Sequence, residues 1–183
     1  MLSLLDGITR NPQMVPIVNP GEHSEVTMQN EVIIDHIGPD GEVKDHRHLK
    51  GNLMTTWGLN ELVEMIAVGT GAASNWIHMA AIGTDNTAPS GNHVGLQGSI
   101  TDTSFVSLSE ASMVRSDGGN RTLQYDMTFD EADVADTISE IGLFCSNSQS
   151  ASMAGRRTFA DINKQSDDVI NATYKVIFNS SAT

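Results

Sequence analysis

The chain has little of what secreted, nucleic-acid-binding or membrane-binding proteins depend on. Its one cysteine, Cys145, excludes a disulfide within the chain and fits a reducing compartment. Lysine and arginine number 10 against 23 aspartates and glutamates, a formal net charge of −13. Phosphate backbones and anionic lipids attract clustered positive charge, so we expect neither nucleic acid nor membrane among the partners.

Long apolar runs and recurrent catalytic motifs are also missing. The first residues lack a basic segment followed by an apolar core, so we predict no signal peptide and no membrane span. The sequence contains no G-x-S-x-G elbow and no H-E-x-x-H zinc motif. A glycine-containing stretch at residues 69–74 lacks the lysine of a phosphate-binding loop. We therefore expect a non-enzymatic protein that needs no cofactor.

The residues that are present favour a single β-rich domain. Aromatic residues are only 5% of the 183, but 39% are hydrophobic, and glycine is frequent at 16 residues. Pro12, Pro16 and Pro20 interrupt the first part of the chain, which excludes a central strand or a long helix there. We predict an extended N-terminal arm over residues 1–29, with these prolines contacting a neighbouring subunit, and a β-sandwich domain over residues 30–183.

Alternating apolar and polar residues predict most of the strands. Leu123, Tyr125, Met127 and Phe129 fall on one face of the clearest strand. A Gly-Pro-Asp-Gly turn at residues 38–41 predicts a hairpin, and its second strand is polar enough to lie at a sheet edge. Strands are predicted at residues 31–37, 42–50, 76–82, 104–115, 121–130, 137–145, 153–159 and 169–178. Their clustering favours an antiparallel, jelly-roll-like β-sandwich.

One short helix is predicted at residues 56–67. Its buried stripe would contain Leu59, Leu62, Val63 and Ile66, and Thr56 would cap its start. The predicted core residues outside the helix include Phe144, Phe159, Tyr174 and Phe178, and we expect Cys145 to be a small buried hydrophobe.

Two groups of side chains are candidates for metal binding. His46 and His48 lie two residues apart, so on a strand they point the same way, and His36 is nearby in sequence. Their alternative role is as ordinary polar residues of an edge strand. A predicted loop holds four acidic residues, which suit either calcium or solvent: Asp130, Glu131, Asp133 and Asp136. Neither group completes a ligand set, so we expect no bound metal.

Arg156 and Arg157 are candidate interface residues. Adjacent residues on a strand face opposite sides, so one arginine can meet a carboxylate of its own domain while the other meets a partner. A solvated strand edge is the alternative, because exposed ion pairs contribute little.

Four segments, in order, resemble a recurrent type of tailed-bacteriophage structural protein. Residues 52–60, NLMTTWGLN, are similar to an N-L-(V/I)-T-x-x-G helix opening, and residues 76–84, WIHMAAIGT, to a W-x-x-(I/L)-G-T-G strand. Residues 139–144, SEIGLF, are similar to x-E-(I/L)-G-(I/L)-F. Residues 153–178 are similar to L-L-A-R-x-x-F, I-N-K and an alternating final strand, with a departure at Gly155. The resemblance covers residues 30–178.

This resemblance implies a virion component, assembled in the host cytoplasm. Our first prediction is a capsid decoration or cement protein that bridges major capsid protein subunits on the outer shell, as a homo-oligomer, a trimer or a dimer. The first alternative is a tail, baseplate or fibre-attachment component. The second is a carbohydrate- or receptor-binding β-sandwich module, which would need a groove with exposed aromatic residues.

Overall fold

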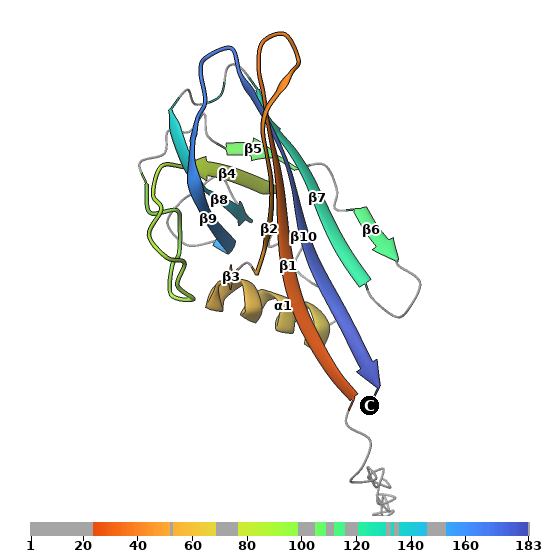
Figure 1. The fold of residues 1–183 in the computed structure, drawn as a ribbon. Helices are drawn as coiled ribbons and strands as arrows, with labels where there is room; N and C mark the ends of the chain where they lie inside the picture. The colour runs from red at the N-terminus through yellow and green to blue at the C-terminus, as the bar shows by residue number, and fades with distance from the viewer. Residues whose placement is uncertain are drawn as a thin grey trace, which may run out of the picture.

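The described part of the chain forms an antiparallel β-sandwich with one short helix, as predicted (Figure 1). The structure, a computed structural model, describes residues 24–51, 53–68, 77–98, 105–108, 112–115, 121–130, 133, 136–145 and 153–182. Within these residues, no helix is long and apolar enough to cross a membrane.

In the described residues, each sheet has five strands. The first contains, in spatial order, β2 (Val43–Lys50), β1 (Ser24–Ile37), β10 (Val169–Ala182), β7 (Arg121–Phe129) and β6 (Ser112–Arg115). The second contains β3 (Leu53–Met54), β9 (Met153–Asn163), β8 (Thr137–Phe144), β4 (Met79–Gly83) and β5 (Phe105–Ser107). The first strand pairs with the last, and β3 pairs with β9, so early strands lie beside late ones in both sheets.

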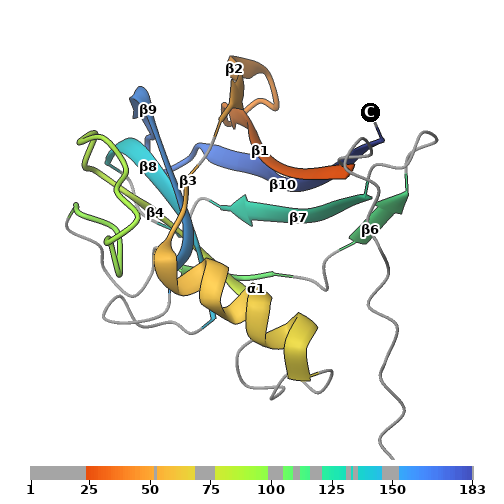
Figure 2. The ribbon, with the colours of Figure 1, turned by 90° about the horizontal axis from the view of Figure 1, so that it is seen from below.

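The two sheets pack against each other (Figure 2). Apolar side chains from both sheets form one main core. Phe129 and Tyr174 come from the first sheet, and Ile141 and Leu143 from the second; none of the four is exposed. The alternation predicted for β7 is confirmed, because Tyr125, Met127 and Phe129 are buried while the intervening residues are not. The polar strand β2 lies at the edge of its sheet, also as predicted.

Two of the predicted strands differ from the structure in their extent. β1 begins at Ser24, so residues 24–29 belong to a strand and not to the arm. The first 23 residues, with Pro12, Pro16 and Pro20, lie outside the described part of the chain. The strand predicted at residues 104–115 is instead two strands, β5 and β6, that belong to different sheets. The hydrophobic pattern could not show this change of sheet, because apolar residues point inward from either one.

The helix α1 (Thr56–Val68) begins at Thr56 as predicted, but its N-cap residue and its buried stripe differ from the prediction. Thr55, not Thr56, caps it: the Thr55 hydroxyl accepts a hydrogen bond from Gly58 N at 3.1 Å. Leu59 is 41% exposed, so it does not belong to the buried stripe. Gly58 faces β9, where a Cβ atom would lie 2.8 Å from the Ala154 Cα atom. Only glycine allows the helix to approach the strand this closely.

The predicted aromatic core is confirmed except at its end. Phe144, Phe159 and Tyr174 are buried, but Phe178 is only partly buried against the core. Phe144 belongs to a second, smaller cluster with Leu96 and others, separate from the main core. Cys145 is buried as predicted, and burial raises the pKa of its thiol to about 12, with a further contribution from the negative charge of Glu61.

Candidate functional site

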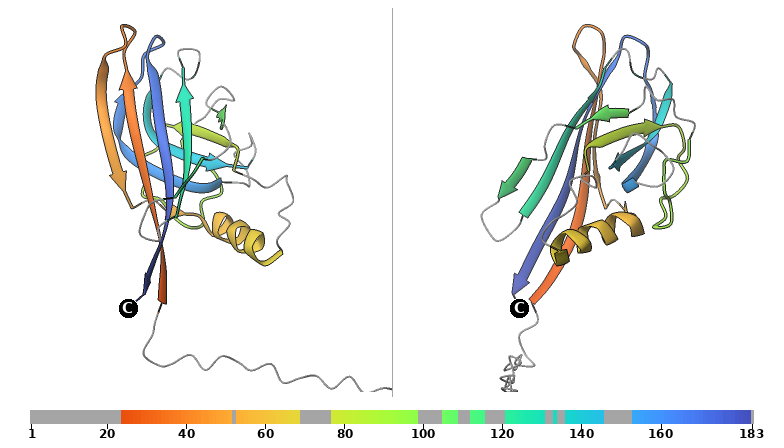
Figure 3. Two further views of the ribbon diagram at one scale, coloured as in Figure 1. Left: turned by 90° about the vertical axis from the view of Figure 1, so that its right-hand side faces the viewer. Right: turned by 180° about the vertical axis from the view of Figure 1, so that it is seen from behind.

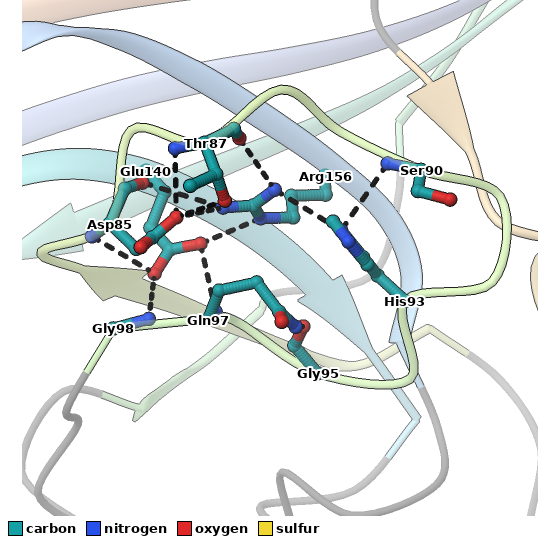
Figure 4. A network of polar contacts seen from close by, with 9 residues as sticks. All are labelled: Asp85, Thr87, Ser90, His93, Gly95, Gln97, Gly98, Glu140 and Arg156. Atoms are coloured by element: carbon teal, nitrogen blue, oxygen red, sulfur yellow. Dashed lines mark hydrogen bonds and ion pairs between the residues drawn. The ribbon is translucent and has the colours of Figure 1, made fainter.

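The densest polar network lies beneath the loop of residues 84–98, which follows β4 (Figure 4). Glu140 of β8 and Arg156 of β9 are its centre, and both side chains are 0% exposed. Gly142 pairs with Arg156 and Glu140 pairs with Thr158, so the two charged residues are diagonal neighbours on adjacent strands. The Arg156 Nε atom donates to Glu140 Oε2 at 2.7 Å.

The rest of the Arg156 guanidinium donates to the loop. Its Nη1 atom lies 3.0 Å from the Thr87 carbonyl oxygen and 3.2 Å from Nδ1 of His93. Its Nη2 atom lies 3.1 Å from Asp85 Oδ1. An arginine can only donate, so the His93 Nδ1 atom is the acceptor in this pair. Ser90 N also points to that atom, at 3.3 Å. The loop therefore wraps around a guanidinium whose three nitrogens are all engaged.

Glu140 holds the two ends of the same loop through their backbone amides. Gly98 N donates to Oε1 at 2.7 Å, and Asp85 N donates to the same oxygen at 3.3 Å. Gln97 N donates to Oε2 at 3.2 Å. A buried carboxylate is tolerated when it is paired and hydrogen-bonded in this way. One side chain thus joins residues 85, 97 and 98 to the centre of the second sheet.

The electrostatics of the loop agree with this geometry. The pKa of Asp85 is held below its ordinary value, first by the hydroxyl and backbone N–H of Thr87 and then by the charge of Arg156, against a smaller opposing effect of burial. Every strong charge in the network has an opposite charge or several donors beside it. Such an arrangement fixes a loop conformation, and it leaves no group poised for acid–base or nucleophilic chemistry.

The network shows which of the two adjacent arginines pairs with a carboxylate of its own domain. Arg156 is the arginine that meets a carboxylate of its own domain, and being wholly buried it is not a contact residue, so its assignment to an interface is wrong. Arg157 pairs with Ile141 and is only partly buried; its Nη1 atom donates to the Gly51 carbonyl oxygen at 2.5 Å. A contact between Arg157 and a partner stays a prediction.

A second charged cluster joins the tips of two hairpins. The Asp168 carboxylate, which is not exposed, accepts from Lys44 Nζ at 2.6 Å and lies 2.7 Å from His36 Nε2. The backbone N–H of Gln165 completes its partners at 3.0 Å. Burial alone would raise the pKa of Asp168, but the bonds from Lys44, Gln165 and His36 together outweigh it and hold the pKa well below its usual value.

The three histidines considered as metal ligands do not converge. His36 is buried beside Asp168, whereas His46 and His48 lie on the exposed face of β2. His46 Nδ1 is 2.6 Å from Asp35 Oδ1, and His48 Nε2 is 3.0 Å from Glu31 Oε2. In the described residues, no group of three or more His, Cys, Asp or Glu side chains could hold a metal ion.

The acidic stretch after β7 is described only in part, because Glu131 lies outside the described residues. Asp133 accepts a hydrogen bond from Asp130 N at 2.8 Å, and Thr137 N donates to Asp136 at 2.7 Å. Burial raises the pKa of Asp133 above its ordinary value, although the hydrogen bond from Asp130 opposes this. These bonds are those of acidic side chains that cap a turn.

Three of the four quoted segments supply polar or small residues to the network or to the part of β9 beside it. Glu140 comes from SEIGLF and Arg156 from the segment that begins at Met153. Thr55 and Gly58 come from NLMTTWGLN: Thr55 N donates to the Ala154 carbonyl oxygen at 3.0 Å, and the Thr55 hydroxyl donates to that of Met153. No catalytic or binding motif in the sequence marks Glu140 as a site residue. Its signal was a lone carboxylate in an otherwise apolar strand, beside a strand with an arginine.

No protein family, no curated protein and no solved structure matches the chain.

Proposed function

We propose that the protein is a non-enzymatic virion structural protein of a tailed bacteriophage, and that it decorates the capsid by bridging major capsid protein subunits on the outer shell. The observation that carries the proposal is the network of Glu140 and Arg156. The segments on which the resemblance depends supply structural parts of one framework: a helix cap, a closely packed glycine and a buried ion pair. A protein whose role is geometry and contact needs such parts and needs no reactive group.

The charge of the protein supports a position on the outside of the shell. A net charge of −13 disfavours proximity to packaged nucleic acid and suits a basic patch on a coat protein. A protein that binds only assembled subunits stabilises the assembly by mass action, by about 2.7 kcal/mol at a concentration one hundred times the dissociation constant. Homo-oligomers, with Arg157 and the segment containing Pro12, Pro16 and Pro20 at contacts, are part of the proposal.

The main alternative is a tail, baseplate or fibre-attachment component, since the resemblance covers both places. A sugar-binding module is less well supported. Among the described residues, Tyr125 and Tyr174 are buried and Trp57 packs against the core, so these aromatic rings are not available to stack on a sugar.

Labelled antibody imaging of intact particles tests the proposal. Label on the head lattice is the expected result, label confined to the tail would favour the alternative, and particles that lack the protein would refute a virion role. A matched experiment adds purified protein to expanded capsids stripped of accessory proteins. Full-length protein should co-sediment and raise the temperature at which the shells disassemble. A variant that begins at Ser24, where β1 begins, should bind more weakly.

A further inference from the structure

The side chain of Arg157 lies between the two sheets without meeting a carboxylate. Its neighbour Arg156 points to the outer side of the second sheet, so Arg157, the next residue of β9, points to the core side. Arg157 pairs with Ile141, a residue of the main core. The ion pairs among the described residues include none with Arg157. In a chain with 23 acidic and 10 basic residues, a part-buried cation without a counter-charge needs an explanation.

The free edge of this guanidinium is the edge that binds carboxylates. Its Nη1 atom donates to the Gly51 carbonyl oxygen at 2.5 Å, whereas its Nε atom is buried and has no hydrogen-bond partner. The Nη2 atom also bonds to none of the described residues, but unlike Nε it is not buried. The N–H groups of Nε and Nη2 are parallel, and such a pair of donors holds the two oxygens of one carboxylate.

The hydroxyl of Tyr174 is a second buried donor without a partner, and it comes from the other sheet. Tyr174 is 0% exposed, and its hydroxyl has no hydrogen-bond partner. Burial raises the pKa of this hydroxyl, Tyr125 raises it further, and the charge of Arg157 lowers it, so the guanidinium lies within electrostatic reach of the hydroxyl. Leaving a buried donor unpaired is costly, and here two such donors extend from the two sheets into the same part of the core.

The fork is open to solvent at the side of the sandwich where the chain crosses from β2 in the first sheet to β3 in the second (Figure 3). Tyr174 pairs with Val32 and Val32 with Leu49, two residues before Gly51, so the tyrosine lies on the row of the first sheet nearest this crossing. Gly51 is exposed, and a Cβ atom added to it would meet no other atom within 4 Å. The Nη2 end of the fork is therefore accessible beside Gly51, while the Nε end lies in the core.

We propose that Arg157 and Tyr174 form a binding site for one carboxylate. Nε and Nη2 of Arg157 donate to its two oxygens, and the Tyr174 hydroxyl donates to the oxygen held at Nε. Three donors without a free acceptor exclude a cation as the ligand. The single positive charge suits a singly charged carboxylate better than a doubly charged phosphate, because a second negative charge would stay unpaired in a part-buried site.

The carboxylate has two possible sources, a small organic acid or an aspartate or glutamate of a second copy of this chain. The same three donors would hold either one. The inference goes beyond the virion role and does not depend on it, since it is argued from Arg157, Tyr174 and Gly51 alone. Failure of the capsid experiments would leave it standing, and its own failure would leave the capsid proposal to the imaging of particles.

Sodium acetate is the probe for a free carboxylate. At constant ionic strength, replacing chloride by acetate should raise the melting temperature of the full-length protein in a saturable way, and phosphate should not. R157K keeps the charge but loses the fork, so it should weaken acetate binding at least about tenfold. Y174F should also weaken it without destabilising the free protein, because the lost hydroxyl has no partner. The control S139A removes another buried hydroxyl without a partner and should leave the acetate response unchanged.

A carboxylate from a second copy gives a distinct result. Sedimentation velocity would then show self-association that acetate competes with and that R157K weakens. Saturable acetate binding that depends on Arg157 and Tyr174 supports the site with or without such association, and acetate-sensitive association assigns the carboxylate to a second copy. An equal acetate response in the wild type, R157K and Y174F would refute the site. So would the absence of any acetate response together with the absence of association that depends on Arg157.

Discussion

Replacing Arg156 by methionine should strongly destabilise the protein. The substitution removes the charge that neutralises Glu140 and leaves a carboxylate with 0% exposure. Glu140 would keep the amides of Asp85, Gln97 and Gly98, but the loop would lose every contact that the guanidinium makes to Asp85, Thr87 and His93. Breaking a buried ion pair by removing one partner costs about 3–5 kcal/mol.

The expected change in melting temperature follows from the size of the chain. For 150–250 residues, 1 kcal/mol corresponds to about 2–4 °C. R156M should therefore melt about 6–20 °C below the wild type. Arg157 offers a matched control on the same strand, because it is only partly buried and its one described hydrogen bond is to Gly51. R157M should cost no more than about 1.5 kcal/mol, the net value of one ordinary hydrogen bond.

A double-mutant cycle separates the ion pair from the remaining effects. In E140L/R156M no buried charge is left over, so the double variant should be less destabilised than the sum of the single variants. It should not recover fully, because a leucine side chain in place of Glu140 cannot accept from the amides of Gln97 and Gly98. Urea unfolding gives the free energies, and hydrogen exchange at these two amides reports the loop. Strict additivity, or an R156M variant within about 1 kcal/mol of the wild type, would refute the reasoning.

Two further predictions follow from the other close contacts. The pKa of Asp168 is lower in the folded protein than in the unfolded chain, so its contribution to stability is complete above the unfolded pKa of about 4 and is lost as the pH falls below it. D168N should be less stable at pH 7, and its free energy of unfolding should fall less steeply than that of the wild type as the pH is lowered. D167N, which changes an exposed neighbour, should match the wild type. Parallel plots of unfolding free energy against pH for D168N and the wild type would contradict this. G58A should destabilise the protein by about 1–3 kcal/mol, because its Cβ would meet the backbone of Ala154. G91A, whose Cβ would make a single contact at 3.4 Å, should be tolerated. Equal destabilisation of the two variants in chemical denaturation would refute the steric argument.

The sequence predicted the strands well because their burial is periodic. β7 alternates between core and solvent, and its faces could be assigned residue by residue. β8 is buried on both faces, so the position of Glu140 within it carries no periodic signal about its surroundings. Pairing with Arg156 depends on the register of β8 and β9, which shifts between Ile138 and Glu140 and again between Leu143 and Phe144. A hydrophobic pattern does not predict where such bulges occur, so it could not predict this pairing.

The longer-range contacts were beyond sequence reasoning for a different reason. His36 and Asp168 are 132 residues apart in sequence. They meet because the end of β1 pairs with the start of β10, Ile37 with Val169. His36 was considered as a metal ligand together with His46 and His48 because it lies near them in sequence. Its parity along β1 places it with Val32 and Ile34, on the buried face. Alternation along β1 alone could have separated it from the two histidines of β2.

The buried ion pair also bears on how the proposed contact would work. A fully buried ion pair such as that of Glu140 and Arg156 seldom gives the highest fold stability, because well-packed apolar residues of the same volume often stabilise a protein as much or more. What apolar residues cannot do is accept from the amides of residues 85, 97 and 98 and donate to the Thr87 carbonyl at the same time. The charges therefore stabilise one conformation of the 84–98 loop more than they stabilise the sheet. Because the loop is already ordered in this way, ordering it would cost a partner little conformational entropy if the loop took part in binding.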